Sequence, residues 1–367
     1  MDSAGVCPRL SGAVGTRRVS LQDHRLLRAR IRALPAVERP GAGHRLAAGR
    51  RAAAVRQGPG RPAARRVRGV RVRILLTGVN GQVGWELQRT LAPLGEVIAA
   101  DRSRLDLADT AGIRRAVDAI APDLIVNPAA YTAVDKAETE PDLAHAINAA
   151  APGELALAAA ARGIPLVHFS TDYVFDGKQS VAYTEADAPN PLGVYGATKL
   201  AGERAVARAG APHLILRASW VYSLRGRNFL LTMQRLLRER ETLAVVDDQF
   251  GAPTWSRLIA EATALVVARW LERLEPTATS GIYHLSCGGR TSWHGFTAAI
   301  RAQLADTDAE LARLTAIPTS GYPTPAARPA NSQLDCDKLA ETFGVRLPDW
   351  ETALALCLNQ DFQQSTQ

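Results

Sequence analysis

The sequence has few cysteines, and none of them is placed for a metal site or a disulfide framework. Its 367 residues include four, Cys7, Cys287, Cys336 and Cys357, which lie far apart and form no C-x-x-C pair or His/Cys cluster. A small secreted domain would have more cysteines at close spacing. The pattern indicates reduced thiols in a cytoplasmic protein.

Long hydrophobic runs are also missing. No window of the sequence reaches the roughly 18 apolar residues that a membrane span needs. The N-terminal part also has no apolar stretch of about 7 to 15 residues, which a secretory signal requires. We therefore expect no membrane partner. A hydrophobic content of 47% over 367 residues fits a globular enzyme with two lobes.

Negative charge is scarce at the N-terminal end. Residues 1–71 contain 17 arginines, no lysine and only three acids, a net charge of +14, and since the whole chain has +8, the remainder has −6. The net positive charge of the chain therefore comes from residues 1–71, which we call the leader. The net charge of the main body does not favour binding to nucleic acid.

The leader, residues 1–71, is rich in Arg and Ala, has few large hydrophobic side chains and shows no sustained apolar periodicity. We expect it to be disordered. An organelle transit peptide and a basic tail that binds polyanions are two open interpretations. We favour a third, a translation start placed too early, with the true start near Val70 or Val72.

The main body contains the segment Tyr195-Gly196-Ala197-Thr198-Lys199. Residues four apart lie on one face of a helix, so Tyr195 and Lys199 can present a phenol and an ammonium side by side. We expect the ammonium to lower the pKa of the phenol toward the range useful for proton transfer. The same spacing also occurs by chance on solvated helices, so the pair indicates catalysis only together with the other motifs of the chain.

A glycine loop lies upstream of this pair. The apolar run Val72–Thr77 leads into Gly78-Val79-Asn80-Gly81-Gln82-Val83-Gly84, and a helical pattern follows from Gln82. Strand, glycine loop and helix together form a phosphate-binding unit, because glycines allow close backbone approach and the helix N-terminus faces the anion. The spacing is G-x-x-G-x-x-G.

A second expected strand, 96–100, ends at Asp101, which lies 23 residues after Gly78. An acid there can accept hydrogen bonds from an adenosine ribose. Arg102 follows, and an arginine could meet a 2′-phosphate, so the pair predicts use of both NADH and NADPH. Asp101 could alternatively be an ordinary turn residue.

Strands and helices then alternate along the chain. Helices are expected at 110–121 and 143–162 and strands at 124–127 and 165–169, with small residues, Pro128-Ala129-Ala130, after the strand at 124–127. This rhythm predicts an α/β fold with a Rossmann-type doubly wound parallel sheet. We expect a nucleotide-binding domain at 72–222, to which later segments can return. A smaller C-terminal α/β substrate lobe is expected at 223–367.

Three further residues are candidates for substrate contacts. Thr171 follows a strand, at the sheet edge where ligands bind, and can hydrogen-bond a carbonyl oxygen, or it can cap the next helix. Trp220 could stack on a sugar or fill the core. Arg328 could neutralise a diphosphate or lie free on the surface. Asp248, Gln249 and Thr254 are expected to shape the cleft between the lobes.

Taken together, these motifs resemble the extended short-chain dehydrogenase/reductases and, among them, the dTDP-4-dehydrorhamnose reductase family. The resemblance runs from about Val72 to beyond Trp350. The motifs are G-x-x-G-Q-V-G-W-E-L-Q (78–88), N-P-A-A-Y-T-A-V-D-K-A-E (127–138), F-S-T-D-Y-V-F-D-G (169–177), N-P-L-G-V-Y-G-A-T-K-L-A-G-E (190–203), R-A-S-W-V-Y (217–222), D-Q-F-G-A-P-T (248–254) and P-T-P-A-A-R-P-A-N-S (323–332).

The resemblance implies reduction of a dTDP-linked 4-keto sugar by hydride from NADPH or NADH. Tyr195 would then be the proton donor, Lys199 its partner, and Thr171 would orient the keto oxygen. The cofactor positions that match the family are Gly81, Gln82, Val83, Asp101, Asp106, Leu107, Ala129, Ala130 and Tyr131. Together with Gly78, Gly84, Arg102, Tyr195 and Lys199, they make up the predicted cofactor-binding set. The positions that match the family's contacts to the nucleotide sugar are Thr171, Asp172 and Trp220, and Thr132 and Arg328 complete the predicted substrate-binding set.

The chain departs from the family at a metal site. Some members bind Mg²⁺ through carboxylates at a subunit contact, and one of these carboxylates matches Glu86. Where a second carboxylate is expected, this chain has Trp255-Ser256-Arg257, and an arginine cannot bind a cation. Mg²⁺ is therefore a doubtful cofactor. A homodimer is one possible assembly of the chain.

Two alternative functions share the same motifs. An epimerase or dehydratase acting on another nucleotide sugar would also use Thr171, Tyr195 and Lys199, but would recycle its cofactor. A regulatory subunit of the same fold would need no catalysis, and such proteins usually lack the tyrosine or the lysine. Both residues are present here, which favours an enzyme.

Overall fold

The computed structural model describes residues 72–273, 275–305, 308 and 310–364. All helices and strands named below belong to one compact unit, Arg66–Gln367. The interpretations of the leader, residues 1–71, concern a segment outside the described residues. Among the described helices, none has the length and apolar character needed to cross a membrane.

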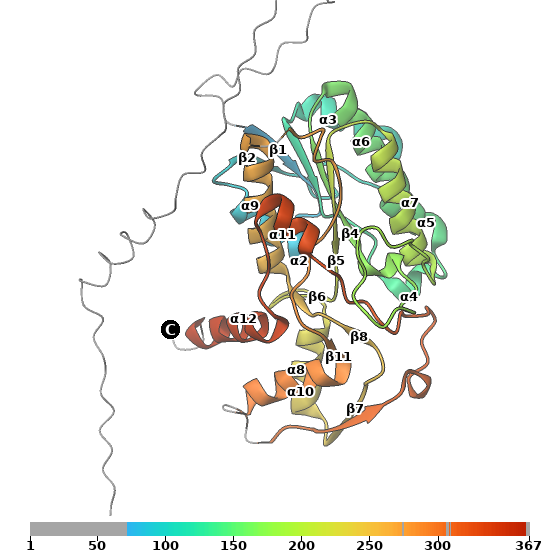
Figure 1. The fold of residues 1–367 in the computed structure, drawn as a ribbon, viewed down its shortest axis with the longest axis vertical. Helices are drawn as coiled ribbons and strands as arrows, with labels where there is room; N and C mark the ends of the chain where they lie inside the picture. Colours follow the sequence, from blue (N-terminus) through green and yellow to red (C-terminus); the bar gives the residue numbers. More distant parts are fainter. Residues whose placement is uncertain (1–71, 274, 306–307, 309, 365–367) are drawn as a thin grey trace, which may run out of the picture. The chain divides into compact units, whose positions relative to one another are not determined.

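A six-stranded parallel sheet forms the centre of this unit (Figure 1). Its order is β10-β5-β4-β3-β1-β2. The strands span β1 (Val72–Leu76), β2 (Gly95–Ala99), β3 (Leu124–Asn127), β4 (Leu166–Thr171), β5 (His213–Ala218) and β10 (Gly281–His284). Strand order reverses direction at β1, next to β3, which is where doubly wound sheets bind ligands. The predicted fold class is confirmed.

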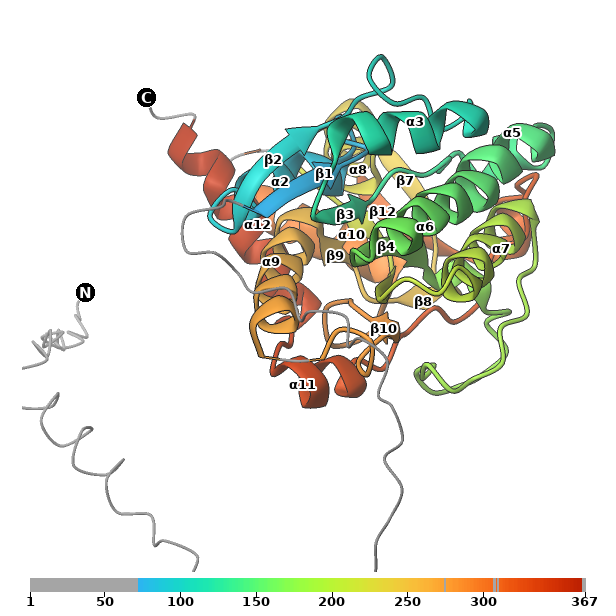
Figure 2. The same cartoon turned by 90° about the horizontal axis from the view of Figure 1, so that it is seen from above.

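Alternate side chains of each strand enter two different cores. Ile74 and Leu76 join a cluster with residues of α2 (Gln82–Thr90) and α9 (Ser256–Arg273), whereas Leu75 points into a cluster with α3 (Thr110–Ile120) and α6 (Ala151–Arg162). This alternation is the period-two pattern of a strand buried on both faces. Figures 1 and 2 show the helices on the two sides of the sheet, with α7 (Val194–Arg208) beside α6.

The helix expected at 143–162 is divided in the structure. It consists of α5 (Pro141–His145), a π-helical turn (Ala146–Ala150) and α6. In the π-helical turn, the Asn148 side chain accepts a hydrogen bond from Tyr131 N at 2.8 Å and donates to Tyr131 O at 3.1 Å. π-Turns inside helices are frequent near functional sites, and this one fixes the loop that follows β3.

The remaining elements come mainly from the second half of the chain. β7 (Thr242–Val246) pairs with β12 (Arg313–Ile317) in parallel, and α10 (Trp293–Leu304) packs on both strands and on α8 (Phe229–Glu239). The shorter elements are α4 (Val134–Ala137), a 3₁₀ turn (Asp172–Val174), β6 (Val221–Tyr222), β8 (Phe250–Gly251), β9 (Thr254–Trp255), β11 (Thr291–Ser292), a 3₁₀ turn (Thr319–Gly321) and α11 (Asp337–Phe343), and the described chain ends with the longer helix α12 (Trp350–Gln364).

The segment after residue 222 contributes to both parts of the fold. β10 pairs with β5 in the central sheet, and α9 packs against α2. The return of later segments to the nucleotide-binding layer is therefore visible. The division between 72–222 and 223–367 stays a prediction.

Candidate active site

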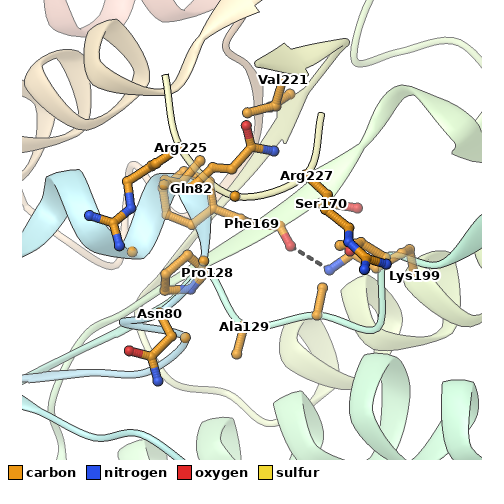
Figure 3. Close-up of a pocket in the computed structure, with 18 of the residues that line it drawn as sticks. Asn80, Gln82, Pro128, Ala129, Phe169, Ser170, Lys199, Val221, Arg225 and Arg227 are labelled. Atoms are coloured by element: carbon orange, nitrogen blue, oxygen red, sulfur yellow. Dashed lines mark hydrogen bonds between the residues drawn. The ribbon is translucent and has the colours of Figure 1, made fainter. Parts of the chain in front are cut away.

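A cavity of about 430 Å³ opens where β1, β3, β4 and β5 end (Figure 3). It brings together most residues that the sequence analysis selected for cofactor binding. Those lining it are Gly78, Gly81, Gln82, Val83, Gly84, Ala129, Ala130, Tyr195 and Lys199, with Thr132 from the substrate set. The pocket therefore joins the glycine loop to the Tyr-Lys pair, which lies more than a hundred residues later in the chain.

The glycine loop has little room for side chains. Gly78 has a left-handed φ of 58°, and a Cβ there would lie 2.8 Å from the Ala129 backbone. A Cβ on Gly84 would lie 2.1 Å from the Gly78 carbonyl oxygen. The first turn of α2 contains no acidic residue, and its N-cap, Gly81, makes no side-chain cap. Its free N–H groups can therefore receive an anion from the cavity.

The polar atoms of the cavity fit a dinucleotide. Two buried side-chain oxygens, Gln82 Oε1 and Ser170 Oγ, lack a hydrogen-bond partner in the part of the chain that the structure describes. Among the described lining residues, three are cationic and none is a carboxylate; the cations are Lys199, Arg225 and Arg227. Such a donor-rich surface suits a pyrophosphate together with polar ring substituents.

Lys199 is buried beside this cavity. Its side chain is 2% exposed, and its Nζ donates a hydrogen bond to the carbonyl oxygen of Phe169 at 2.6 Å. Desolvation lowers the pKa of Lys199 to about 8, although the carboxylate of Glu203, one turn further along α7, acts in the opposite direction. The ammonium is thus present at neutral pH and is lost as the pH rises through about 8.

The pKa of Tyr195 differs from the expectation. We expected the ammonium of Lys199 to lower it, but desolvation raises the pKa of Tyr195 to about 12, and only a hydrogen bond with Thr171 lowers it in part. The physical reason is that the phenol is removed from water while the Lys199 ammonium bonds the Phe169 carbonyl. The prediction of an acidified phenol is wrong for this state of the site.

Tyr195 can still act as an acid when its pKa is raised. A phenol with a raised pKa is fully protonated at neutral pH, which a proton donor must be. Its proton can leave when a stronger base, such as a sugar alkoxide, forms next to it. The hydrogen bond to Thr171 shows that these two predicted catalytic side chains lie together.

Thr171 and Asp172 form a buried polar cluster at the end of β4. Thr171 Oγ1 donates to Asp172 Oδ1 at 2.9 Å and accepts from Tyr173 N at 3.2 Å. The other carboxylate oxygen of Asp172 accepts from Ser219 Oγ at 3.1 Å. Burial raises the pKa of Asp172 to about 6 despite these donors. The cluster fixes the Thr171 hydroxyl beside Tyr195.

Trp220 forms part of an aromatic stack away from the glycine loop. It has a left-handed φ of 47°, and its ring lies on that of Trp293 with centroids 3.4 Å apart and 2° between planes. A Cβ on Gly251 would lie 2.5 Å from the Trp220 ring, so a glycine is needed there. Trp293 lines a second cavity of about 420 Å³, between α8, β7 and the loop at 322–328. A sugar contact for Trp220 stays a prediction.

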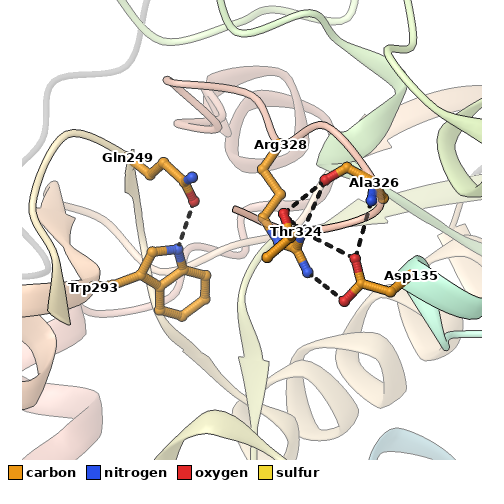
Figure 4. A network of polar contacts seen from close by, with 6 residues as sticks. All are labelled: Asp135, Gln249, Trp293, Thr324, Ala326 and Arg328. Atoms are coloured by element: carbon orange, nitrogen blue, oxygen red, sulfur yellow. Dashed lines mark hydrogen bonds and ion pairs between the residues drawn. The ribbon is translucent and has the colours of Figure 1, made fainter. Parts of the chain in front are cut away.

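Arg328 also lines the second cavity, but its charge is already paired (Figure 4). Its two terminal nitrogens bond the carboxylate oxygens of Asp135 at 3.1 and 2.9 Å, and it also donates to Ala326 O and Thr324 Oγ1. The fork geometry fixes the loop at 324–328 to α4. A diphosphate contact would have to share this guanidinium with Asp135, and that role stays a prediction.

Five residues of the predicted cofactor set lie outside the residues that line the first cavity. Asp101 accepts a hydrogen bond from Ser103 Oγ at 2.6 Å, which contributes most to its lowered pKa, and Arg102 pairs with Asp106 at 3.1 Å. Leu107 is buried in the core. The phenol of Tyr131 donates a hydrogen bond to Glu140. Their cofactor roles remain predictions.

The residues tested for a metal have other partners. Glu86 accepts from Arg89 at 2.5 Å, and Arg257 pairs with Glu261 at 3.1 Å. Within the described ranges, no group of three or more His, Cys, Asp or Glu side chains is placed to hold a metal ion. A Mg²⁺ site at Glu86 therefore stays a prediction without geometric support.

Sequence reasoning missed several residues that line the first cavity. They are Asn80, Pro128, Phe169, Ser170, Ala218, Val221, Arg225, Gly226 and Arg227. Some adjoin predicted residues and could have been found by extending the motifs. Arg225 and Arg227 have no such signal, because they follow β6 at a long distance from the glycine loop in sequence.

Comparison with known proteins gives one consistent picture. The family model "RmlD substrate binding domain" matches residues 72–362. A dTDP-4-dehydrorhamnose reductase from Burkholderia thailandensis is 49% identical over 298 residues, which cover 80% of this chain and 100% of that protein. One from Salmonella typhimurium is 47% identical over 299 residues, covering 80% and 99%.

A solved structure agrees with these matches. The crystal structure of dTDP-4-dehydrorhamnose reductase from Bacillus anthracis in complex with NADP superposes with a TM-score of 0.72 at 34% identity, and covers 79% of this chain and 100% of that one. The family match to residues 72–362 includes both the central sheet and the elements that follow it.

Proposed function

The chain belongs to the RmlD substrate-binding-domain family, and from this premise we propose that it reduces dTDP-4-dehydro-β-L-rhamnose to dTDP-L-rhamnose with NAD(P)H, the last step of dTDP-rhamnose biosynthesis. Relatives at 49% and 47% identity are named dTDP-4-dehydrorhamnose reductases. The observation that carries the proposal is the single cavity that contains the glycine loop, Tyr195 and Lys199.

A reduced nicotinamide bound in this cavity supplies the hydride. The glycine loop and the N-terminus of α2 hold its pyrophosphate. The cavity extends from Gly81 to Lys199, so protein groups are available to contact both ends of a dinucleotide. The NADP complex of the Bacillus anthracis enzyme supports this cofactor class, and use of both NADH and NADPH remains our proposal from Asp101 and Arg102.

Tyr195 donates the proton that the reduction requires. As C4 of the sugar gains hydride, its oxygen gains negative charge, and the Tyr195 hydroxyl transfers its proton to that oxygen. Thr171, which bonds both Tyr195 and Asp172, orients the keto oxygen. The Lys199 ammonium, held by Phe169 O, provides the positive charge that balances the phenolate left behind.

The nucleotide sugar contacts the residues between the two cavities. We propose Thr132, Asp172, Trp220 and Arg328 for this role, because Thr132 lines the first cavity, Arg328 lines the second, and Trp220 stacks on a wall of the second. A cytoplasmic location is supported by the three free cysteines of the described residues. A homodimer remains a proposal.

An assay of cofactor consumption tests the function. The purified chain is mixed with dTDP-4-dehydro-L-rhamnose and NADPH or NADH, and the absorbance of the reduced nicotinamide is followed. We expect one nicotinamide to be oxidised per sugar reduced. Turnover of the sugar without net oxidation would instead indicate an epimerase or dehydratase, and no turnover with either nicotinamide would favour a regulatory subunit.

A further inference from the structure

The first cavity has a second wall that the family motifs do not include. It is the loop Ser223–Asn228, which connects β6 to α8 and places Arg225, Gly226 and Arg227 along the cavity. The opposite wall is the glycine loop with Gln82 and Val83 of α2. A ligand in this cavity therefore lies between backbone N–H groups on one side and two guanidinium groups on the other.

The loop is rigidly built. Ser223 Oγ donates to Arg225 O at 2.7 Å and accepts from Arg225 N at 3.2 Å. Asn228 Nδ2 donates to Ser223 O at 2.9 Å and to Arg225 O at 3.1 Å, while its Oδ1 caps α8 by accepting from Leu231 N. Gly226 turns the chain with a φ of 74°. These bonds fix the backbone from which both arginines extend.

Arg225 is also fixed through its side chain. Its guanidinium carbon lies 3.5 Å from the centroid of the Trp85 ring, on α2, so the loop is joined to the helix whose N-terminus faces the cavity. Stacking on an aromatic ring leaves the N–H groups at the edge of a guanidinium free to bond other acceptors. In Figure 3, Arg225 lies toward the α2 end and Arg227 toward Ser170 and Lys199.

The charge of this wall is not neutralised. Neither Arg225 nor Arg227 forms an ion pair with a carboxylate of the described residues, and the described residues that line the cavity include no Asp or Glu. Two unpaired guanidiniums held over a helix N-terminus suit two linked phosphates. A diphosphate could come from the dinucleotide or from the sugar nucleotide.

We propose that Arg225 and Arg227 bind the cofactor pyrophosphate from the side opposite the glycine loop. The cofactor is favoured over the sugar nucleotide because the arginines share their cavity with Gly81, Gln82 and Val83, whereas Arg328 and Trp293 line the other one. The inference rests on the proposed nicotinamide chemistry and adds two residues to its binding site.

Direct binding measurements on the full chain test it. NADPH, NADH and dTDP are titrated by calorimetry into the wild type, Arg225→Gln and Arg227→Gln, with Arg235→Gln as matched control. Arg235 is exposed on α8 and pairs only with Glu239 in the described salt bridges. We expect each cavity variant to bind both nicotinamides about tenfold to hundredfold more weakly, and the control to match the wild type.

Each other outcome has one meaning. Weakened NADPH binding with unchanged NADH binding would overturn the proposal, since only a 2′-phosphate contact gives that result. Weakened dTDP binding alone would assign the arginines to the sugar nucleotide and also overturn it, as would unchanged binding of all three ligands. If the wild type itself binds no nicotinamide, the proposed function fails. Circular dichroism melting shows that each variant is folded.

Discussion

The central residue of the account is Tyr195. Tyr195 lines the cavity, its hydroxyl forms a hydrogen bond with Thr171, and burial raises its pKa to about 12, so the phenol is protonated at neutral pH. We expect Tyr195→Phe to lower kcat by about 10²- to 10⁴-fold, the usual contribution of a general acid. Stopped-flow reduction of the keto sugar gives the rate, and calorimetry with NADPH shows whether binding persists.

The phenylalanine variant separates chemistry from structure. It keeps the ring and its edge contact with Tyr173, whose centroid lies 5.4 Å away. Thr171→Val, which keeps the size of the side chain, is the companion variant and should also reduce kcat. A Tyr195→Phe enzyme that reduces the sugar at the wild-type rate would remove Tyr195 from the mechanism.

The lowered pKa of Lys199 leads us to expect that activity depends on pH. Its pKa is lowered to about 8 by desolvation, so the ammonium that balances the Tyr195 phenolate is lost as the pH rises through this value. We expect kcat/KM to fall above about pH 8 in a profile measured from neutral pH upward. A profile that stays flat through this range would contradict the role of the ammonium.

The titration of Lys199 affects stability in the opposite direction: activity falls as the pH rises, whereas the free energy of unfolding increases. Between the folded pKa of about 8 and the ordinary lysine pKa of 10.5, the unfolded chain keeps a proton on Lys199 that the folded chain has released. The free energy of unfolding from this group therefore rises with pH across that window. Urea titrations of the wild type and Lys199→Met should show this rise only in the wild type.

At the scale of elements, the glycine loop depends on close contacts. A Cβ on Gly84 would lie 2.1 Å from Gly78 O, so Gly84→Ala must displace α2 from the loop. Overpacking of this kind typically costs about 1–3 kcal/mol. We expect NADPH binding, measured by calorimetry, to weaken about tenfold or more.

Gly321→Ala is the matched control for this change. A Cβ on Gly321 meets only ordinary contacts, the nearest at 3.7 Å from Ile317. It should leave NADPH binding unchanged. Equal binding by Gly84→Ala and Gly321→Ala would show that the loop does not touch the cofactor.

A buried ion pair joins α7 to β5. Arg217 donates to Glu203 through Nε at 2.8 Å and Nη2 at 2.6 Å, and both side chains are almost fully buried. Removing one partner leaves a buried charge uncompensated, which typically costs about 3–5 kcal/mol. We expect Glu203→Gln to lower the free energy of unfolding by about this amount in urea titrations.

The exposed pair Arg235–Glu239 is the comparison for Glu203. It lies on the surface of α8 with a distance of 2.6 Å. Exposed pairs contribute about 0–1 kcal/mol, so Glu239→Gln should change the unfolding free energy very little. A similar loss in the two variants would contradict the structural importance of the buried pair.

For the whole molecule, the sequence predicted the part that follows from local patterns. Alternating strands and helices gave the parallel sheet, and the G-x-x-G-x-x-G loop and the Tyr195–Lys199 spacing gave two groups of cavity residues. Both patterns are short-range, so they can be recognised in the sequence without knowledge of the tertiary structure.

The rest depended on tertiary packing. Arg225 and Arg227 reach the cavity because the loop between β6 and α8 packs on α2, where Arg225 stacks on Trp85, and no short-range sequence pattern predicts this contact. The direction of the Tyr195 pKa shift was missed because burial outweighs a neighbouring charge once Lys199 bonds Phe169 O. The π-helical turn at Asn148 was likewise invisible in an alanine-rich segment.

The family match predicts that residues 1–71 are unnecessary for catalysis. It covers residues 72–362, and the central sheet begins at Val72. A variant lacking residues 1–69 should keep the kcat/KM and the NADPH affinity of the full chain. Heparin-affinity chromatography of both forms measures polyanion binding, and a loss of activity on deletion would give the leader a catalytic role.

The most direct test of the whole account follows the hydride itself. NADPH deuterated at C4 of the nicotinamide, on the face that is transferred, is incubated with dTDP-4-dehydro-L-rhamnose, and the product is analysed by NMR and mass spectrometry. We expect one deuterium at sugar C4 for each NADPH oxidised. A product without deuterium at C4, or sugar turnover with all NADPH retained, would contradict it.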